Sequence, residues 1–307
     1  MVIWMRSLTR SSRKNKPANW KRQIFEMTET WTVKKLLNWS ETHLKEKGID
    51  APRSDIEVML AEILQTGRMG VYLNYDKILT PAELSRYKEF ILRRRENEPV
   101  QYIIGKAFFY GRTFAVHKGC FIPRFSSEAL IDVFLKKKKE EGIGTSIIEI
   151  GGGSGCIGLT LALERDDIMV DIIERSPEAS ALIRKNMKAH GLAERATLIE
   201  GDFFTLSPQK SYDAVICNPP YIVPGDPHLE AQVRDFEPAE ALYGGSDGLD
   251  FYRRLKDKLS VWAKGSWIFL EIGYNQAKAV QEIFQPAEVE IEKDLSGVQR
   301  VAYFYRP

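Results

Sequence analysis

The residues best suited to chemistry form one short run, Asn-Pro-Pro-Tyr at positions 218–221. The Asn218 side-chain oxygen and the Pro219 carbonyl are two acceptors that can take both hydrogens of a planar –NH2 group. Pro219 and Pro220 hold φ at about −65° and so keep that carbonyl in place, while the Tyr221 ring offers a flat face to an amide or a base. The run indicates transfer of a group to a weakly nucleophilic amino nitrogen that has to be oriented. A proline-stiffened loop after a strand is the structural alternative.

A glycine-rich loop marks a second candidate site. Residues 151–158 read Gly-Gly-Gly-Ser-Gly-Cys-Ile-Gly, directly after the apolar segment 146–150 and before an apolar helix. Glycines there let the backbone bend and let a ligand approach a helix N-terminus. Read from Gly153, the loop also satisfies the dinucleotide pattern G-x-G-x-x-G. By itself it therefore leaves nicotinamide or flavin dinucleotides and S-adenosylmethionine open.

Side chains at the neighbouring strand ends favour S-adenosylmethionine. Glu149 precedes the loop, where a carboxylate near the mouth suits a cationic ligand better than a pyrophosphate. Glu174 ends the next strand and can accept both ribose hydroxyls, and Asp202 with Phe203 ends the third, where they can meet an adenine edge and face. Each acid alone could be a solvated strand end, but four strand ends in order argue against that. The predicted site comprises Glu149, Gly151, Gly152, Gly153, Ser154, Gly155, Glu174, Asp202, Phe203 and Asn218.

The elements that must position these residues alternate between strand and helix from Ser127 onward. A helix at 128–135 ends in four lysines, Lys136–Lys139, which we interpret as a solvated C-terminal turn favoured by the helix dipole. Alternating strands and helices predict a doubly wound, mostly parallel sheet whose last strand enters antiparallel. Strands are expected at 146–150, 169–173, 196–199, 212–217, 266–272 and 299–305, with helices such as 177–190 and 250–262 between them.

The preceding residues form a different pattern. A first helix follows Trp31, and a second starts near Pro52 and ends at Gly67. A third opens at Thr80, which forms a capping box with Glu83. Residues 27–98 are therefore expected to be a small helical domain, 99–122 a β-hairpin connector and 123–307 the catalytic domain.

Charge is distributed unevenly along the chain. Residues 1–26 carry seven Lys or Arg and one acid, whereas the remainder has a net charge of −4, without the basic bias of a duplex-binding enzyme. The basic head predicts a disordered tail or an extension before a start at Met27, with an organelle-targeting segment as the alternative. The chain contains no apolar run of about 18 residues, so no membrane span is expected. Three scattered cysteines indicate reduced thiols and match no metal or redox spacing.

At this point the chain resembles a known family. The order Glu-x-Gly-x-Gly-x-Gly, Glu174, Asp-Phe and Asn-Pro-Pro-Tyr is similar to class I S-adenosylmethionine-dependent methyltransferases that act on planar amino groups. More narrowly, residues 27–307 resemble the release-factor glutamine N5-methyltransferases of the PrmC/HemK type. The family usually has Pro-Arg-Pro-x-Thr-Glu where Phe125 and Ser127 stand here, and often Asp in place of Glu174. The further matching segments are 51–57, 93–99, 121–124, 227–229, 236–238 and 270–273.

The resemblance implies both a fold and an activity. It implies a seven-stranded class I methyltransferase sheet, a helical substrate-recognition domain, and methyl transfer from S-adenosylmethionine to the glutamine of a release factor's Gly-Gly-Gln loop. The residues expected to act on that amide are Asn218, Pro219, Pro220 and Tyr221. Neither a metal, nor direct contact with nucleic acid, nor a membrane is expected, and the location is cytoplasmic, or mitochondrial if residues 1–26 are a transit segment.

Three other functions compete with this one. An amino-methyltransferase acting on adenine or another base of DNA or RNA would share the Asn-Pro-Pro-Tyr run. A dinucleotide-dependent oxidoreductase has only the glycine loop in its favour, and a catalytically silent binding module is disfavoured by the intact run at 218–221.

Overall fold

The computed structural model describes residues 29–208 and 210–307. The basic head of residues 1–26 lies outside this part of the chain. The chain divides into two compact units, of which one ends at Arg95 and the other covers Glu96–Pro307. None of the helices in the described part is long and apolar enough to cross a membrane.

The N-terminal unit is helical, as its sequence pattern predicts. Its third expected helix begins as the capping box requires: Glu83 N donates to Thr80 Oγ1 over 3.2 Å, and Thr80 N donates to Glu83 Oε2 over 2.7 Å. The expectation that the second helix continues to Gly67 is wrong, because Gly67 precedes a separate short helix. The helices are α1 (Val33–Glu46), α2 (Arg53–Ile63), α3 (Arg68–Leu73) and α4 (Pro81–Arg95).

The second unit opens with a helical turn and a hairpin. Strands β1 (Lys106–Phe109) and β2 (Arg112–Ala115) pair antiparallel, as expected for the connector. The β-like expectation for the residues before them is wrong, since α5 (Val100–Ile104) is a helix that Gly105 ends at a φ of 74°.

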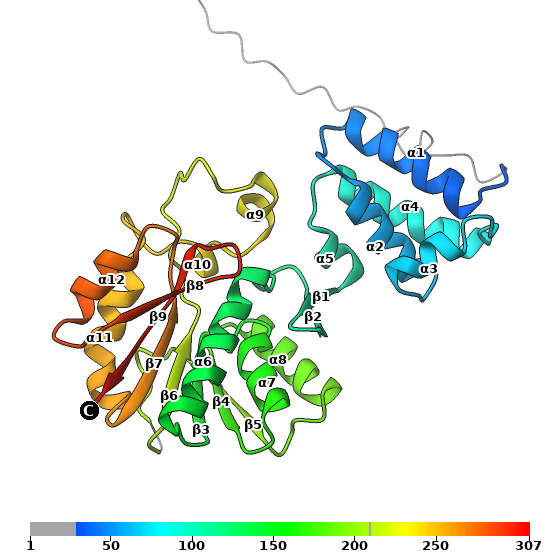
Figure 1. Cartoon of the computed structure of the whole chain (residues 1–307). Coiled ribbons are helices and arrows are strands. Elements are labelled where there is room, and N and C mark those ends of the chain that lie inside the picture. The colour runs from blue at the N-terminus through cyan, green and yellow to red at the C-terminus, as the bar shows by residue number, and fades with distance from the viewer. Residues whose placement is uncertain (1–28, 209) are drawn as a thin grey trace, which may run out of the picture. The chain divides into compact units, whose positions relative to one another are not determined.

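A seven-stranded sheet is the centre of the second unit (Figure 1). Its strand order is β5-β4-β3-β6-β7-β9-β8, and only β9 and β8 pair antiparallel to their neighbours. The sequence pattern misses β8, a short edge strand with little apolar content. The strands are β3 (Ser146–Ile150), β4 (Met169–Glu174), β5 (Ala196–Glu200), β6 (Ala214–Cys217), β7 (Ser266–Glu271), β8 (Glu290–Lys293) and β9 (Gln299–Arg306).

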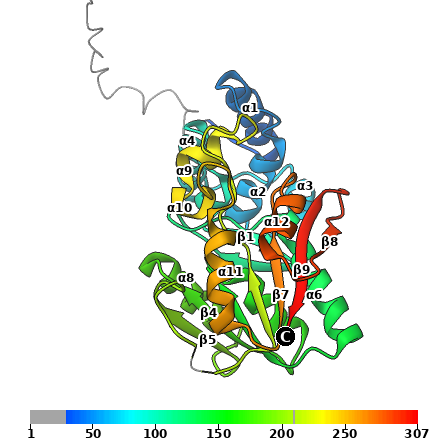
Figure 2. The ribbon, with the colours of Figure 1, turned by 90° about the vertical axis from the view of Figure 1, so that its left-hand side faces the viewer.

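Alternation along the central strands produces two separate cores. On β6, Ala214 and Ile216 belong to one core, whereas Val215 and Cys217 belong to the other. Figures 1 and 2 show helices on both faces of the sheet, which is the doubly wound arrangement expected from the sequence. The first core takes α6 (Glu128–Glu141), α7 (Cys156–Glu164) and α8 (Pro177–Ala189), and the second takes α11 (Asp250–Trp262) and α12 (Ala277–Phe284).

The lysine run of α6 differs from its expected environment. Helix α6 continues through these lysines to Glu141. Lys137 Nζ lies 5.1 Å from the centroid of the Tyr303 ring. Lys138 Nζ donates to the carbonyl oxygens of Ile143 and Gly144, each over 2.8 Å. The prediction of a fully solvated run is therefore wrong for these two side chains, whose long aliphatic stems pack while their ammonium groups find partners.

Phe269 of β7 is the best single test of the first core. It is fully buried and contacts the rings of Phe134 and Tyr303. Phe269→Ala should lower the free energy of unfolding by about 3–5 kcal/mol, because it removes a packed ring and leaves a cavity. Chemical denaturation followed by circular dichroism measures this loss. Leu295→Ala, at a side chain that is 84% exposed, serves as the control and should cost less than about 0.5 kcal/mol; equal losses would contradict the assigned core.

Candidate active site

A cavity of about 870 Å³ lies at the carboxyl ends of the parallel strands in the second unit. Residues that follow β3, β4 and β6 line it, together with the segment before α6 and residues 228–245. Open parallel sheets bind ligands at this edge, because loops from several strands converge there. Nine of the ten residues of the predicted cofactor site and all four of the predicted catalytic run line this cavity. The exception is Gly155, which does not line it and directly precedes α7.

The glycine loop has a backbone that other residues would strain. Gly151 and Gly153 have φ of 72° and 57°, in the left-handed region. Gly152 has an ordinary φ, but a Cβ there would lie 2.3 Å from Cγ2 of Ile172. The loop therefore passes closely over β4 and leaves its backbone open to the cavity.

A buried asparagine anchors this loop from outside. Asn186 of α8 donates through Nδ2 to the Ser154 carbonyl over 2.8 Å, and its Oδ1 accepts from Ala115 N of β2 over 2.8 Å. One amide side chain thus ties the glycine loop to the hairpin. Sequence reasoning did not single out Asn186, because a lone polar residue in an amphipathic helix carries no spacing signal.

Glu149 differs from expectation in its environment. It is 2% exposed, and its Oε2 accepts from Gly158 N over 2.9 Å at the start of α7. Burial raises the pKa of Glu149 to about 8. Glu149 lines the cavity but is almost fully buried, and its bond to Gly158 N holds the start of α7 to β3.

Glu174 is held so that it faces the cavity with a fixed orientation. Its Oε2 accepts from Gly153 N and its Oε1 accepts from Ser176 N, both over 2.8 Å. Each carboxylate oxygen retains lone pairs beyond these two bonds. Glu174 can therefore accept a pair of hydroxyl donors without moving.

The adenine-type subsite predicted after β5 is only partly as expected. Asp202 Oδ1 accepts from Phe204 N over 2.9 Å. Phe203 is 4% exposed and packs on Trp262, so most of its ring belongs to the core and not to the cavity. Phe204, which the sequence reasoning missed, also lines the cavity. The centroid of its ring lies 3.7 Å from Cζ of the Arg254 guanidinium.

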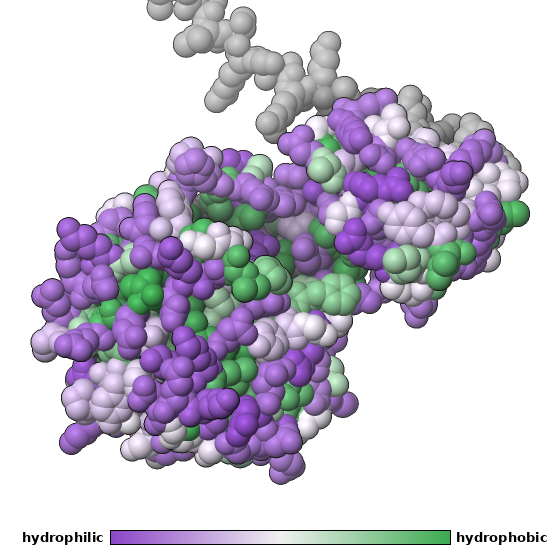
Figure 3. Space-filling view, in the orientation of Figure 1, coloured by the Kyte–Doolittle hydropathy of each residue, from purple (hydrophilic) through white to green (hydrophobic). Residues whose placement is uncertain are grey.

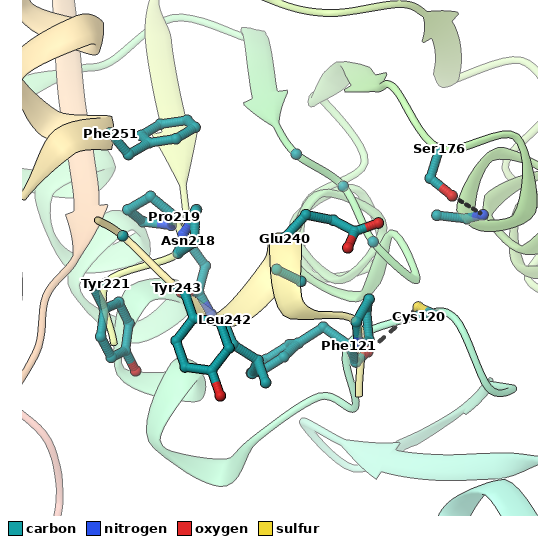
Figure 4. A pocket seen from close by; sticks show the side chains of 18 of the residues that line it. Cys120, Phe121, Ser176, Asn218, Pro219, Tyr221, Glu240, Leu242, Tyr243 and Phe251 are labelled. Carbon is teal, nitrogen blue, oxygen red and sulfur yellow. Dashed lines mark hydrogen bonds between the residues drawn. The ribbon is translucent and has the colours of Figure 1, made fainter. Parts of the chain in front are cut away.

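The Asn-Pro-Pro-Tyr run leaves the end of β6 in the middle of the sheet. Figure 4 shows Asn218 and Pro219 at that strand end, with Tyr221, Leu242 and Tyr243 nearby and Ser176 across the cavity. Asn218 Nδ2 donates to Ser127 Oγ over 3.1 Å, which leaves Oδ1 as an acceptor. Tyr221 donates its hydroxyl to Glu271 Oε1 over 3.0 Å.

The carbonyls of this loop are fixed by close contacts. Gln276 Nε2 donates to the Tyr221 carbonyl over 3.0 Å and to the Gly248 carbonyl over 3.2 Å. Gly244 lies so close that a Cβ there would be 2.6 Å from the Pro220 oxygen and 2.7 Å from the Gly248 oxygen. The backbone after β6 therefore has little freedom to shift.

An ion pair between the half-buried Arg124 and the buried Glu237 joins two segments that line the cavity. Glu237 accepts from Ile122 N over 3.0 Å and from the Arg124 guanidinium. Burial raises the pKa of Glu237, and Arg124 opposes that shift. The matching segments 121–124 and 236–238, which are far apart in sequence, thus meet in one contact.

The chain is similar to known protein families, to curated proteins and to solved structures. Residues 35–105 match the PrmC N-terminal domain and residues 119–242 match the methyltransferase small domain. A release factor glutamine methyltransferase of Geobacter sulfurreducens is 37% identical over 281 residues, which cover 90% of this chain and 97% of the relative. One of Bacillus anthracis is 36% identical over 284 residues, covering 88% and 98%. Among solved structures, the hMettl16 catalytic domain in complex with MAT2A 3'UTR hairpin 6 has a TM-score of 0.50 at 14% identity, covering 73% of this chain and 81% of that one.

The close approach of Gly244 yields a prediction. Gly244→Ala should lower stability by about 1–3 kcal/mol, because the added methyl group must displace the Pro220 carbonyl or the backbone at Gly248. Gly67→Ala is the matched control, since a Cβ there meets no atom within 4 Å and its φ of −80° suits any residue. Thermal unfolding of both full-length variants compares them, and equal midpoints would show that the loop after β6 is not constrained in this way.

Proposed function

The chain belongs to the release factor glutamine methyltransferase family, and we propose that the glutamine it methylates lies in the Gly-Gly-Gln loop of peptide chain release factors. It is an S-adenosylmethionine-dependent methyltransferase whose product is a release factor methylated on glutamine. The observation that carries the proposal for the site is the orientation of Asn218, whose Nδ2 is committed to Ser127 and whose Oδ1 remains an acceptor at the end of β6.

The residues of the cavity fit S-adenosylmethionine, which supplies an electrophilic methyl group on a sulfonium sulfur. Glu174 is an oriented double acceptor of the kind that a ribose diol requires. The glycine loop can present bare backbone to the cofactor. A side chain at Gly152 is excluded there, because its Cβ would collide with Ile172. We propose that Glu174 holds the ribose and that Asp202 and Phe204 contact the adenine. Residues 151–155 would border the remainder of the S-adenosylmethionine molecule.

The protein's own contribution to methyl transfer is to orient the accepting nitrogen. The lone pair of an amide nitrogen is delocalised into its carbonyl, so the barrier falls mainly through positioning and electrostatics. Asn218 Oδ1 and the Pro219 carbonyl would accept the two N–H bonds, and Tyr221 would cover the amide plane. Both acceptors follow β6, which is hydrogen-bonded to β3 and β7 on its two sides. A rigid strand end thus carries the groups that have to be placed most accurately.

The proposed substrate loop suits this cavity. A glutamine that follows two flexible glycines can enter a narrow site with few neighbouring side chains that would collide with the walls. The N-terminal unit offers a second contact surface, because Met69 and Leu73 of α3 are 73% and 81% exposed. Figure 3 shows hydrophobic residues among the mostly hydrophilic ones on the surface of this unit. We propose that this unit contributes to recognition of the folded release factor. The cytoplasm remains the location that we propose.

The first prediction from this proposal concerns the cofactor. Glu174→Ala should weaken binding of S-adenosylmethionine at least tenfold, because hydrogen bonds to a charged group contribute about 1.5–3 kcal/mol each. Glu200→Ala is the control: Glu200 is paired in register with Glu174 on β5, but its side chain is 52% exposed and bonded to Arg184. Calorimetric titration should give near-normal affinity for the control. Equal affinities of the two variants would refute the role of Glu174.

The second prediction concerns the chemical step. Asn218→Ala should reduce turnover with intact release factor by about 10²–10³, the scale for loss of one preorganised polar contact. Transfer of a labelled methyl group to the release factor measures this rate. Near-normal turnover in a natively folded variant would rule out the orienting role of Asn218.

The same assay tests the substrate. Labelled methyl should enter intact release factor, should be lost when the loop glutamine is replaced by Ala, and should enter a short Gly-Gly-Gln peptide much more slowly. The peptide has to be ordered on binding and lacks remote contacts. Label in a duplex or single-stranded oligonucleotide, with none in release factor, would favour a nucleic-acid methyltransferase instead.

A further inference from the structure

An arginine lies directly against the aromatic wall of the cavity. Arg254 of α11 and Phe204, which follows β5, both line the cavity. Cζ of Arg254 lies 3.7 Å from the centroid of the Phe204 ring, which is van der Waals contact. An atom beside the edge of the ring would be farther from the centroid, because the carbon and hydrogen atoms of the ring intervene. The guanidinium therefore covers a face of Phe204.

Arg254 takes this position although an acid is within the usual reach. Asp250 lies four residues earlier on the same helix, a spacing at which an acid and an arginine commonly pair. Asp250 is bonded to Arg253 instead, over 3.0 Å. In the part of the chain that the structure describes, the Arg254 side chain makes no hydrogen bond or ion pair. Its guanidinium therefore keeps five N–H donors for a ligand or for water.

The strand order places this contact at one end of the cofactor site. β5 is the edge strand, and β4 and β3 separate it from β6. Three strand spacings of about 4.8 Å put the ends of β5 and β6 about 14 Å apart. Asn218 follows β6, and under the proposed function the methyl group of the cofactor has to lie beside it. Phe204 and Arg254 thus lie toward the opposite end of the cofactor, which is the adenine.

The charges of the cofactor favour the same assignment. S-adenosylmethionine carries positive charge on its sulfonium and on its amino group, and a guanidinium close to either would be repelled. Its adenine is neutral and presents an electron-rich face and acceptor nitrogens, which suit a flat cation with N–H donors. The carboxylate of its amino-acid part would also attract Arg254, but the contact of Arg254 with Phe204 lies toward the other end of the molecule.

Phe251 belongs to the same end of the cavity. It lines the cavity, and its ring meets the Phe204 ring in a T-shaped contact with the centroids 5.2 Å apart. Figure 4 shows Phe251 on one side of Asn218 and Tyr221 on the other. The aromatic cluster that carries Arg254 therefore lies apart from the side chain that would cover the glutamine amide.

We propose that Arg254 binds the adenine ring of S-adenosylmethionine and that Phe204 holds its guanidinium in place for this contact. The inference rests on the proposed function and adds to it a residue that neither the glycine loop nor the strand ends indicate. Asp202 supplies an acceptor and Phe204 an apolar surface, whereas Arg254 supplies the donors and the cation. Because the guanidinium already lies on Phe204, it has less freedom to lose when the adenine binds.

Calorimetric titration with the cofactor and a fragment of it tests the proposal without any turnover. Arg254→Ala should raise the Kd for S-adenosylmethionine and for S-adenosylhomocysteine about tenfold, the scale for loss of a group that stacks on a base. The Kd for methylthioadenosine, which keeps the adenine and ribose but lacks the amino-acid part, should rise by the same factor. Arg254→Lys should still bind all three at least threefold more weakly than the unsubstituted enzyme, because lysine keeps the charge but not the planar guanidinium. Arg254 is exposed, so neither variant should change the melting temperature.

Arg86→Ala is the matched control. Arg86 of α4 also lies over a phenylalanine, with Cζ 5.6 Å from the centroid of the Phe90 ring, but it does not line the cavity. Its replacement should change each Kd less than about twofold. Equal Kd values for the Arg254→Ala and Arg86→Ala variants would overturn the proposal.

The fragment separates the two ends of the cofactor. If Arg254→Ala weakened binding of S-adenosylmethionine and S-adenosylhomocysteine but left the Kd for methylthioadenosine unchanged, Arg254 would act on the amino-acid carboxylate, and the proposal would be overturned. Failure of the unsubstituted enzyme to methylate release factor would instead refute the proposed function, so the two failures are distinguishable.

Discussion

The site depends on one constraint: polar side chains at the ends of central parallel strands are buried or half-buried, so protein partners fix the direction in which they point. Asn218, Glu271 and Glu149 follow or end β6, β7 and β3, which are neighbours in the sheet. Solvent cannot satisfy Glu271 and Glu149, which are almost fully buried, whereas Asn218 is half-buried at the edge of the cavity. Their bonds to Ser127, Tyr221 and the start of α7 therefore determine where the remaining acceptors of the site point.

The fold supplies the rigidity that this constraint needs. The central strands alternate their side chains between two cores, so β6 is held by packing on both faces and by hydrogen bonds on both edges. The loop that follows cannot relax, because Gly244 and Gln276 contact its carbonyls directly. An amide substrate needs this rigidity more than it needs a base, since its nitrogen reacts only when it is correctly oriented.

The sequence predicted much of this arrangement, and the reasons for its failures are physical. Periodicity and capping residues predicted the parallel strands and the start of α4, and convergence of strand ends predicted which residues meet. Three contacts escaped it: Asn186 to Ser154, Arg124 to Glu237, and Ser127 to Asn218. Each joins residues that are distant in the chain, and no local pattern encodes such a pairing. Glu149 and Phe203 were placed correctly along the chain, but their burial was not foreseen because it depends on how α7 and Trp262 pack.

A crystal structure of the enzyme with S-adenosylhomocysteine and an intact release factor would test the central claim most directly. The account predicts that the nitrogen of the loop glutamine lies within hydrogen-bond distance of Asn218 Oδ1 and of the Pro219 carbonyl oxygen, with Asn218 Nδ2 still bonded to Ser127. A glutamine held elsewhere in the cavity, or an Asn218 amide that turns its Nδ2 toward the substrate, would contradict it.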